Sequence, residues 1–183
     1  MVAFSSTNIM LKNMLKIKQQ LINEILQHLH TELTQAIQAA NNAHNDAVDD
    51  QSVAETQYDT LAIEASYLAE GQSKRVLEYQ HAIKTYQVML NVQQSKKLEN
   101  NDHVTHIAKL GSLVQLDKDN SCNHWFFIGP FAGGFRTNIN EHQITVVTPQ
   151  SPMGIAIKGK QQDDDIEITL GNEKLHDYIC AVK

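Results

Sequence analysis

Residues 144–160 read ITVVTPQSPMGIAIKGK and hold the pattern that decides the fold of the second half of the chain. The run ITVV is typical of a strand, because it is short, β-branched and bounded by turn residues. Pro149, Pro152 and Gly154 bracket a short element after it. Since proline is favoured at the first position of a helix, we expect a helix to begin at Pro152.

Further strand patterns lie on both sides of this segment. LGSLVQLD at 110–117 alternates between apolar and other residues, and WFFIG at 125–129 is a short apolar run followed by proline. DIEITL at 165–170 and YICAV at 178–182 are two more strand patterns. The region 108–183 is therefore predicted to be a small β-rich domain that carries one short helix.

The preceding region, residues 8–98, has the composition of long helices. It contains no proline and one glycine, Gly71, and it is rich in Ala, Leu, Gln, Glu and Lys. Two amphipathic stripes separated by a short break predict an antiparallel coiled-coil hairpin over residues 1–98, with a linker at 99–107. The expected seam residues are Leu15, Ile22, Ile25, Leu29, Ala36, Ala40 and Ala43 in the first helix, and Tyr58, Leu61, Ala65, Leu68, Tyr79, Ile83, Tyr86 and Leu90 in the second, where Gln72 and Arg75 interrupt the stripe.

The break between the two helices is expected at 45–52, NDAVDDQS, and it makes the tip of the hairpin acidic. Ser52 and Glu55 form an S-x-x-E capping box, which predicts that the second helix begins near Val53. Asp49 and Asp50 also suit the electrostatics of a helix N-terminus. Together with Asp46, these acids place four carboxylates near one apex, at about 45–55.

Composition and charge exclude several classes of protein. The net charge of −6 argues against a general nucleic-acid binder, which needs basic side chains to displace counterions from phosphates. We expect no membrane span, because no apolar run approaches the roughly 18 residues that one requires. The N-terminus lacks a secretory signal pattern, so a cytoplasmic protein is expected. The spacing of His124, His142 and His176 is irregular, and no stable metal site is predicted for the protein alone.

The C-terminal motifs resemble those of the Gre transcription elongation factors, the GreA/GreB family. The stretch from Ile144 to Lys160, followed by Asp163-Asp-Asp-Ile-Glu-Ile, is similar to the family's "SP-(I/L)-(G/A)-x-A-(L/I)-x-G-K" signature, acidic turn and strand. Gly111-Ser-Leu-Val-Gln-Leu and Phe126-Phe-Ile-Gly129 are similar to two other strands of that domain. The order of a helical hairpin before such a domain is also the family's architecture.

The resemblance implies an α+β fold, in which the hairpin is joined to an FKBP-like domain at 108–183. It implies a bacterial, monomeric protein that binds RNA polymerase at the secondary channel, with Ser151, Pro152, Met153 and Gly154 in or near the contact. Nucleic acid would be met only within the transcription complex. The protein would be no enzyme and would have no cofactor of its own. Its tip acids Asp46, Asp49, Asp50 and Glu55 would help to hold a magnesium ion of the polymerase and stimulate the polymerase's own cleavage of a backtracked transcript.

The tip departs from the family's pattern, and this leaves alternatives open. Cleavage-stimulating members carry a G-D-x-x-E-N element, whereas no glycine precedes Asp50 and position 53 is valine. A regulator that occupies the secondary channel without stimulating cleavage fits the same architecture. A coiled-coil adaptor that dimerises through the hairpin would explain the same heptads. Near the predicted contact, Pro152 can simply start a helix, and Met153 and Ile155 can belong to the core.

Overall fold

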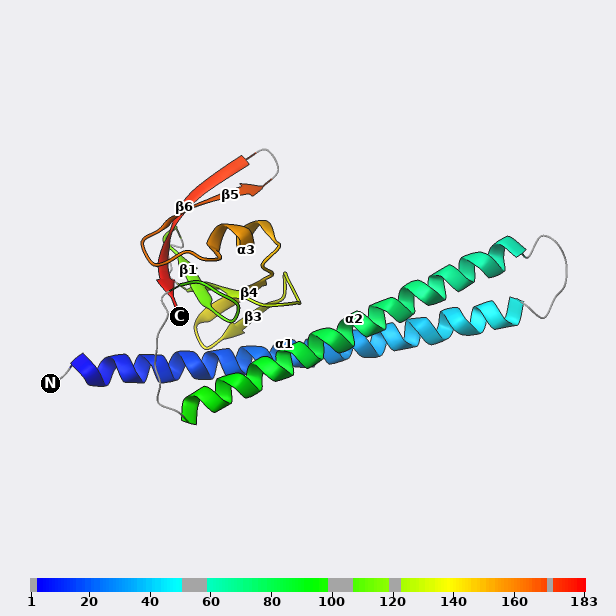
Figure 1. The fold of residues 1–183 in the computed structure, drawn as a ribbon, viewed down its shortest axis with the longest axis horizontal. Coiled ribbons are helices and arrows are strands. Elements are labelled where there is room, and N and C mark those ends of the chain that lie inside the picture. Colours follow the sequence, from blue (N-terminus) through cyan, green and yellow to red (C-terminus); the bar gives the residue numbers. More distant parts are fainter. Residues whose placement is uncertain (1–2, 51–58, 99–106, 119–122, 171–172) are drawn as a thin grey trace. The chain divides into compact units, whose positions relative to one another are not determined.

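A computed structural model describes residues 3–50, 59–98, 107–118, 123–170 and 173–183 of the chain. The fold is α+β: two long N-terminal helices precede a six-stranded mixed sheet that carries one short helix, as the sequence predicted (Figure 1). The elements are α1 (Ala3–Asp50), α2 (Asp59–Leu98), β1 (Leu113–Leu116), β2 (His124–Ile128), β3 (Arg136–Ile139), β4 (His142–Val147), α3 (Pro152–Ile157), β5 (Asp165–Leu170) and β6 (Glu173–Val182).

The chain forms two compact units. One unit joins Met1–Ile25 to Tyr86–Lys183, and the other is Leu26–Thr85. The first therefore holds the sheet together with the beginning of α1 and the end of α2. The second holds the rest of both helices. The FKBP-like character of the sheet region stays a prediction.

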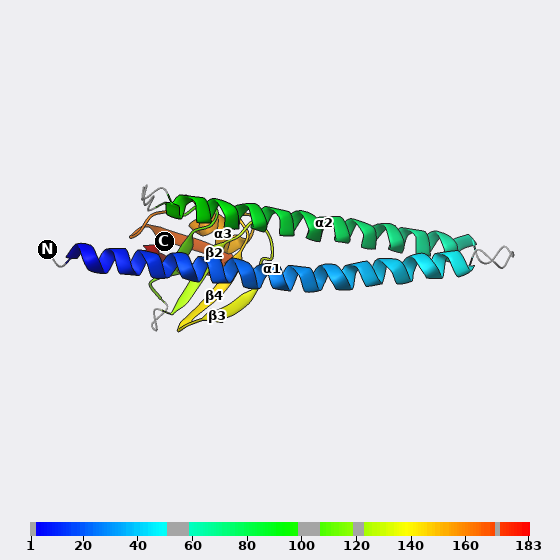
Figure 2. The same ribbon diagram turned by 90° about the horizontal axis from the view of Figure 1, so that it is seen from below.

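In the unit Leu26–Thr85, α1 and α2 run antiparallel side by side (Figure 2). Leu29, Ala36 and Ala43 are buried along α1 at intervals of seven residues, which confirms this part of the predicted seam. Tyr79 of α2 donates a hydrogen bond of 2.9 Å from its hydroxyl to the Glu32 carboxylate of α1. The two helices thus form an intramolecular hairpin whose facing side chains include a polar pair.

The seam of α2 differs from the prediction around residue 68. Leu68 is 55% exposed, whereas Gln72 is half-buried. Leu68 lies seven residues before Arg75, so both project from the same flank of the helix, and the Arg75 side chain is also exposed. The seam of α2 instead includes Tyr79 together with Gln72, Val76 and Ile83, which are buried or half-buried.

In the first unit, the sheet has the order β3-β4-β2-β1-β6-β5. β2 and β4 pair in parallel, and the other neighbouring strands are antiparallel. β3 was missed by sequence reasoning because its residues, RTNI, show no apolar alternation. It is an edge strand that pairs only with β4, through a tight turn at which Asn140 has a φ of 56°. Asparagine tolerates this left-handed conformation better than most residues.

Helix α3 begins at Pro152, as predicted, and covers one face of the curved sheet (Figure 1). Met153, Ala156 and Ile157 pack into a cluster of buried apolar side chains from the strands. The strand residues of that cluster are Val114, Leu116, Ile128, Val147, Ile166, Ile168, Ile179 and Val182. A short helix of six residues is therefore held by packing rather than by its own propensity.

The helical ends in this unit contact the loops and the edge of the sheet. Tyr86 of α2 is fully buried, and its hydroxyl donates a hydrogen bond of 2.7 Å to the Phe131 carbonyl after β2. Burial raises the pKa of the Tyr86 hydroxyl well above its usual value. The Thr137 hydroxyl of β3 donates to the Glu24 carboxylate of α1. These hydrogen bonds satisfy polar groups at the points where helix and sheet meet.

Replacing Ala36 with leucine should destabilise the hairpin by about 1–3 kcal/mol, because the larger side chain overpacks a seam position that is buried. Gln35→Leu is the matched control, since residue 35 is exposed on the same helix. Urea unfolding followed by circular dichroism measures both. Equal midpoints for the two variants would contradict the burial of Ala36 between the helices.

Candidate functional site

The first candidate site is the beginning of α3, where a serine caps the helix. Ser151 has extended backbone angles, and its Oγ accepts a hydrogen bond of 3.1 Å from the Gly154 amide. The same hydroxyl donates to the Thr148 carbonyl at 2.8 Å. Pro152 takes the first helical position, where its missing N–H is not needed. The Ser151 hydroxyl therefore makes these hydrogen bonds within the turn itself. This local role accounts for serine at 151 and proline at 152.

Gly154 is buried because the backbone of the preceding loop approaches it closely. A Cβ added at this position would overlap the carbonyl oxygen of Thr148. A glycine is thus required by the packing of α3 onto the turn after β4. Since Gly154 has no exposed surface of note, its part in any contact would be to shape the helix rather than to touch a partner.

The side chains that this turn offers to solvent are those of Pro152 and Ile155. Pro152 is exposed, and Ile155 is 66% exposed. Three residues apart on a helix, they lie on one face. Met153, in contrast, is partly buried against the core cluster. Of the four residues proposed from the sequence for this contact, Pro152 is the one that the structure leaves exposed.

Ile155 was treated in the sequence as a possible core residue, and the structure corrects this. The core positions of α3 are Met153, Ala156 and Ile157. Ile155 falls between them and points away from the cluster. The signal that could have found it is its spacing of three residues from Pro152, which places it on the opposite side from Ile157. A large apolar side chain that is this exposed on a capped, rigid helix is a candidate for contact with a partner.

Basic and acidic groups follow α3. Lys158 ends the helix and is exposed, and the Lys160 ammonium donates to the Asp165 carbonyl at 3.0 Å. The Asp164 carboxylate accepts a hydrogen bond of 2.7 Å from the Gln161 amide. This aspartate therefore stabilises the turn before β5. Lys158 thus follows the exposed residues Pro152 and Ile155 in the sequence. The acidic residues 163–165 come five to seven residues after Lys158.

The second candidate site is the acidic tip, and here α1 is longer than expected. The helix continues through Asp50, so the break predicted at 45–52 begins too early. Asparagine and aspartate cost only a few tenths of a kcal/mol to about 0.7 kcal/mol in a helix, which is not enough to end one. Residues 46, 49 and 50 are helical. Their side chains, and the whole of Ser52 and Glu55 with the expected capping box, lie outside the described residues.

The position of Asp49 and Asp50 also changes their electrostatic interpretation. They lie in the last turn of α1, not at the start of the next helix, and that turn holds no basic residue. Acids at a helix C-terminus are disfavoured by the helix dipole, typically by about 0.3–1 kcal/mol each. They therefore do not stabilise the helix in which they stand.

The histidines that invited a metal interpretation lie in separate places. His124 interacts through Nε2 with the Thr145 hydroxyl at 2.9 Å, and the His142 ring packs edge-on against Trp125. His176 is 3.5 Å from the Glu167 carboxylate. Hydrogen bonding by Lys174 lowers the pKa of Glu167. Among the residues that the structure describes, no three His, Cys, Asp or Glu side chains are grouped as metal ligands. Nor is any described helix long and apolar enough to cross a membrane.

Comparisons with known proteins give matches in structure only. No protein-family model matches the chain. No curated protein matches its sequence. GreA factor homolog 1 (Gfh1) of Thermus thermophilus is 13% identical over 90% of this chain and 94% of its own, with a TM-score of 0.33. Gfh1 of Thermus aquaticus is 16% identical over 85% and 92%, with a TM-score of 0.30. A further structure of the transcription factor Gfh1 gives 13% identity, coverage of 86% and 92%, and a TM-score of 0.34. Superpositions this loose carry no argument about function.

Gly154→Ala should destabilise the sheet unit by about 1–3 kcal/mol, because the new methyl group must displace the Thr148 carbonyl. Gly71→Ala is the matched control. No atom lies within 4 Å of a Cβ at residue 71, so alanine should stabilise α2 by up to about 1 kcal/mol. Thermal unfolding of both variants measures the difference. A Gly154→Ala protein as stable as the unchanged chain would show that the turn can relax.

Proposed function

We propose that this chain is a Gre-like transcription elongation factor that binds RNA polymerase at its secondary channel and modulates elongation. The observation that carries the proposal is the motif at 144–160, which resembles the Gre signature and forms β4, the capped turn and α3. A helical hairpin precedes this domain in the chain, in the order that the family has. The protein acts on the polymerase and has no catalytic centre of its own.

In this proposal α3 supplies the polymerase contact. The Ser151 cap, Pro152 and the buried Gly154 hold the helix rigidly on the sheet. Pro152 and Ile155 then form a small preorganised apolar surface, and a rigid surface loses little conformational entropy when it is bound. The partner would be a protein surface with an apolar element, since the net charge of −6 does not suit a phosphate backbone.

The tip is proposed to act on the catalytic metal of the polymerase. Magnesium is held by one or two carboxylates and keeps several waters, so an acidic arm could stabilise an ion that the polymerase holds loosely. Asp49 and Asp50 follow Asp46 by three and four residues within α1, the spacings at which helical residues are neighbours. A non-cleaving regulator of the secondary channel is the alternative, because the tip lacks the family's G-D-x-x-E-N element.

Ile155→Ser should weaken binding to core RNA polymerase at least tenfold, which corresponds to about 1.4 kcal/mol. Tyr178→Ser is the matched control, because Tyr178 is 57% exposed on β6 and should leave binding unchanged. Biolayer interferometry with immobilised polymerase measures both. The α3 contact is refuted if the two variants bind alike. If the unchanged chain itself shows no affinity, the proposed function is wrong.

Replacing Asp49 and Asp50 together with asparagine should abolish the effect on transcription while polymerase binding persists. The change keeps the size of both side chains and removes two charges. Asp163→Asn with Asp165→Asn removes two charges from the turn before β5 and the first residue of β5, and this variant is the control. Transcript cleavage by a stalled, backtracked elongation complex is the measurement. If the unchanged chain binds but stimulates no cleavage, the non-cleaving alternative holds, and pause duration then becomes the readout for the tip.

A further inference from the structure

A polar cluster joins α1 to α2 within the unit Leu26–Thr85. The Tyr79 hydroxyl of α2 donates a hydrogen bond of 2.9 Å to the Glu32 carboxylate of α1, and it accepts one of 3.1 Å from the Arg75 guanidinium. Arg75 Nη2 also lies 3.8 Å from Glu32 Oε2, and Arg75 Cζ lies 5.5 Å from the centroid of the Tyr79 ring. Glu32, Tyr79 and Arg75 thus form a clamp in which each side chain contacts the other two.

The residues of the clamp have few equivalents along the hairpin. From Leu26 to Asn45, Glu32 is the only acidic or basic residue, histidines set aside, and Arg75 is the only arginine in either helix. Any ion pair between this stretch of α1 and a lysine or arginine must therefore use Glu32. Both hydrogen bonds of the Tyr79 hydroxyl involve a charged group, and such bonds are shorter and stronger than those between neutral groups.

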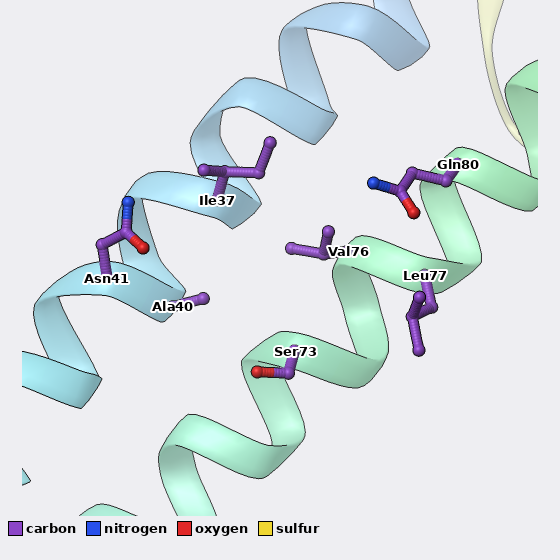
Figure 3. Close-up of a pocket in the computed structure, with 7 residues that line it drawn as sticks. All are labelled: Ile37, Ala40, Asn41, Ser73, Val76, Leu77 and Gln80. Carbon is purple, nitrogen blue, oxygen red and sulfur yellow. The ribbon is translucent and has the colours of Figure 1, made fainter.

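Apolar packing between the helices is thin from the clamp toward the end of α1. Among the described residues, the buried side chains of α1 in that direction are Ala36 and Ala43, and an alanine buries little apolar surface. A groove of about 350 Å³ is open where Ala40 and Ser73 extend toward each other (Figure 3). Leu77 borders this groove, but its side chain is 65% exposed and points away from α1. Apolar contacts alone therefore hold the helices loosely at this level.

A small change of tilt at the clamp would displace the end of α1 by a large amount. Asp50 comes 18 residues after Glu32 in the same helix, which is about 27 Å at the helical rise. A tilt of about 5° at Glu32 then moves the last turn of α1 by roughly 2 Å. Groups that act on a reacting centre must be held to within about 0.5 Å of their productive geometry.

The clamp is suited to fixing a direction rather than to stabilising the fold. The Arg75 side chain is 56% exposed and that of Glu32 is 27% exposed, and ion pairs with this much access to water contribute little to stability. Their hydrogen bonds still favour one distance and one direction between the two helices. Tyr79 is half-buried in the seam, so its hydroxyl is carried on a side chain with restricted freedom.

We propose that the clamp sets the tilt between α1 and α2 and thereby positions the tip acids Asp46, Asp49 and Asp50. Its members are positioning residues, because they act through the helix and not on the metal or the transcript. The inference rests on the proposed function of the tip. The tilt itself can be measured in the free protein, so the two can fail separately.

Distances between spin labels on the two helices test the tilt. Double electron–electron resonance is measured with labels at Asn42 and Glu70, which are both exposed. The labels are attached through noncanonical amino acids, so that the two cysteines stay unchanged. Tyr79→Phe should broaden the distance distribution about twofold, because it removes the directional hydrogen bonds and keeps the ring. Tyr67→Phe is the matched control and should leave the distribution unchanged, since Tyr67 is 71% exposed on the same helix.

A reversed ion pair tests whether the contact itself sets the tilt. Glu32→Arg alone places two guanidinium groups beside each other and should also broaden the distribution. Combined with Arg75→Glu, it restores opposite charges, and the Tyr79 hydroxyl can again accept from a guanidinium and donate to a carboxylate. The combined variant should return to the distribution of the unchanged chain. Circular dichroism should show the same helix content in every variant.

Transcription measures the consequence for the tip. Tyr79→Phe should lower the effect of the protein on a backtracked elongation complex about tenfold, because displacements near 1 Å cost this much or more. Its affinity for polymerase should stay close to that of the unchanged chain, because α3 is unaltered. A variant that had merely lost stability would not separate binding from effect in this way.

The proposal is overturned if Tyr79→Phe leaves the distances unchanged, or if the reversed pair does not restore them. Broadened distances with an undiminished effect on transcription overturn it as well, because the clamp would then not position the tip. If the unchanged chain has no effect on transcription, the proposed function fails and the positioning of the tip falls with it. The distances still decide in that case whether the clamp sets the tilt.

Discussion

The buried hydroxyl of Tyr86 is the constraint on which the sheet unit depends. Burying a hydroxyl without a hydrogen-bond partner costs about 1–3 kcal/mol, as judged from mutations in proteins. The Phe131 carbonyl supplies that partner. Gly129 lies so close that a side chain there would overlap the Tyr86 hydroxyl. A buried hydrogen bond in a tightly packed position therefore joins the end of α2 to the loop after β2.

The turn before α3 also combines a hydrogen bond with close packing at a glycine. Thr148, through its carbonyl, meets both the Ser151 hydroxyl and the backbone of Gly154. These contacts hold the first turn of α3 on the loop after β4, and Ile155 is exposed on the helix held in this way. The motif that resembles the Gre signature is thus mostly a description of how a short helix is held on a sheet. The exposed residues Pro152 and Ile155 are the ones that can contact a partner.

In the hairpin, by contrast with the sheet unit, several features do not stabilise the fold. Acids occupy the last turn of α1, where the helix dipole disfavours them. Leu68 and Leu77 are exposed, and small residues leave a groove between the helices. Features that lower the stability of a fold are expected mainly at functional sites, where a protein contacts a partner. The proposal made for the tip of the hairpin rests on such a feature.

The sequence by itself determined the fold class, the helical hairpin, five of the six strands and the start of α3 at Pro152. These are local patterns: apolar periodicity, the absence of proline and glycine before residue 98 apart from Gly71, and turn residues after it. The resemblance to the Gre factors also came from the sequence alone.

Only the tertiary structure decided the phase of α2, the strand β3, the length of α1 and the exposure of Ile155. Leu68 is apolar but lies on the flank that Arg75 shares, because the seam is set by contacts across the hairpin. β3 has no apolar alternation and forms because it pairs with β4 through backbone hydrogen bonds. Ile155 lies outside because Ile157 fills the core position. For the phase of α2 and for β3, a residue's environment depends on a partner distant in the chain, and the local sequence carries no record of that partner.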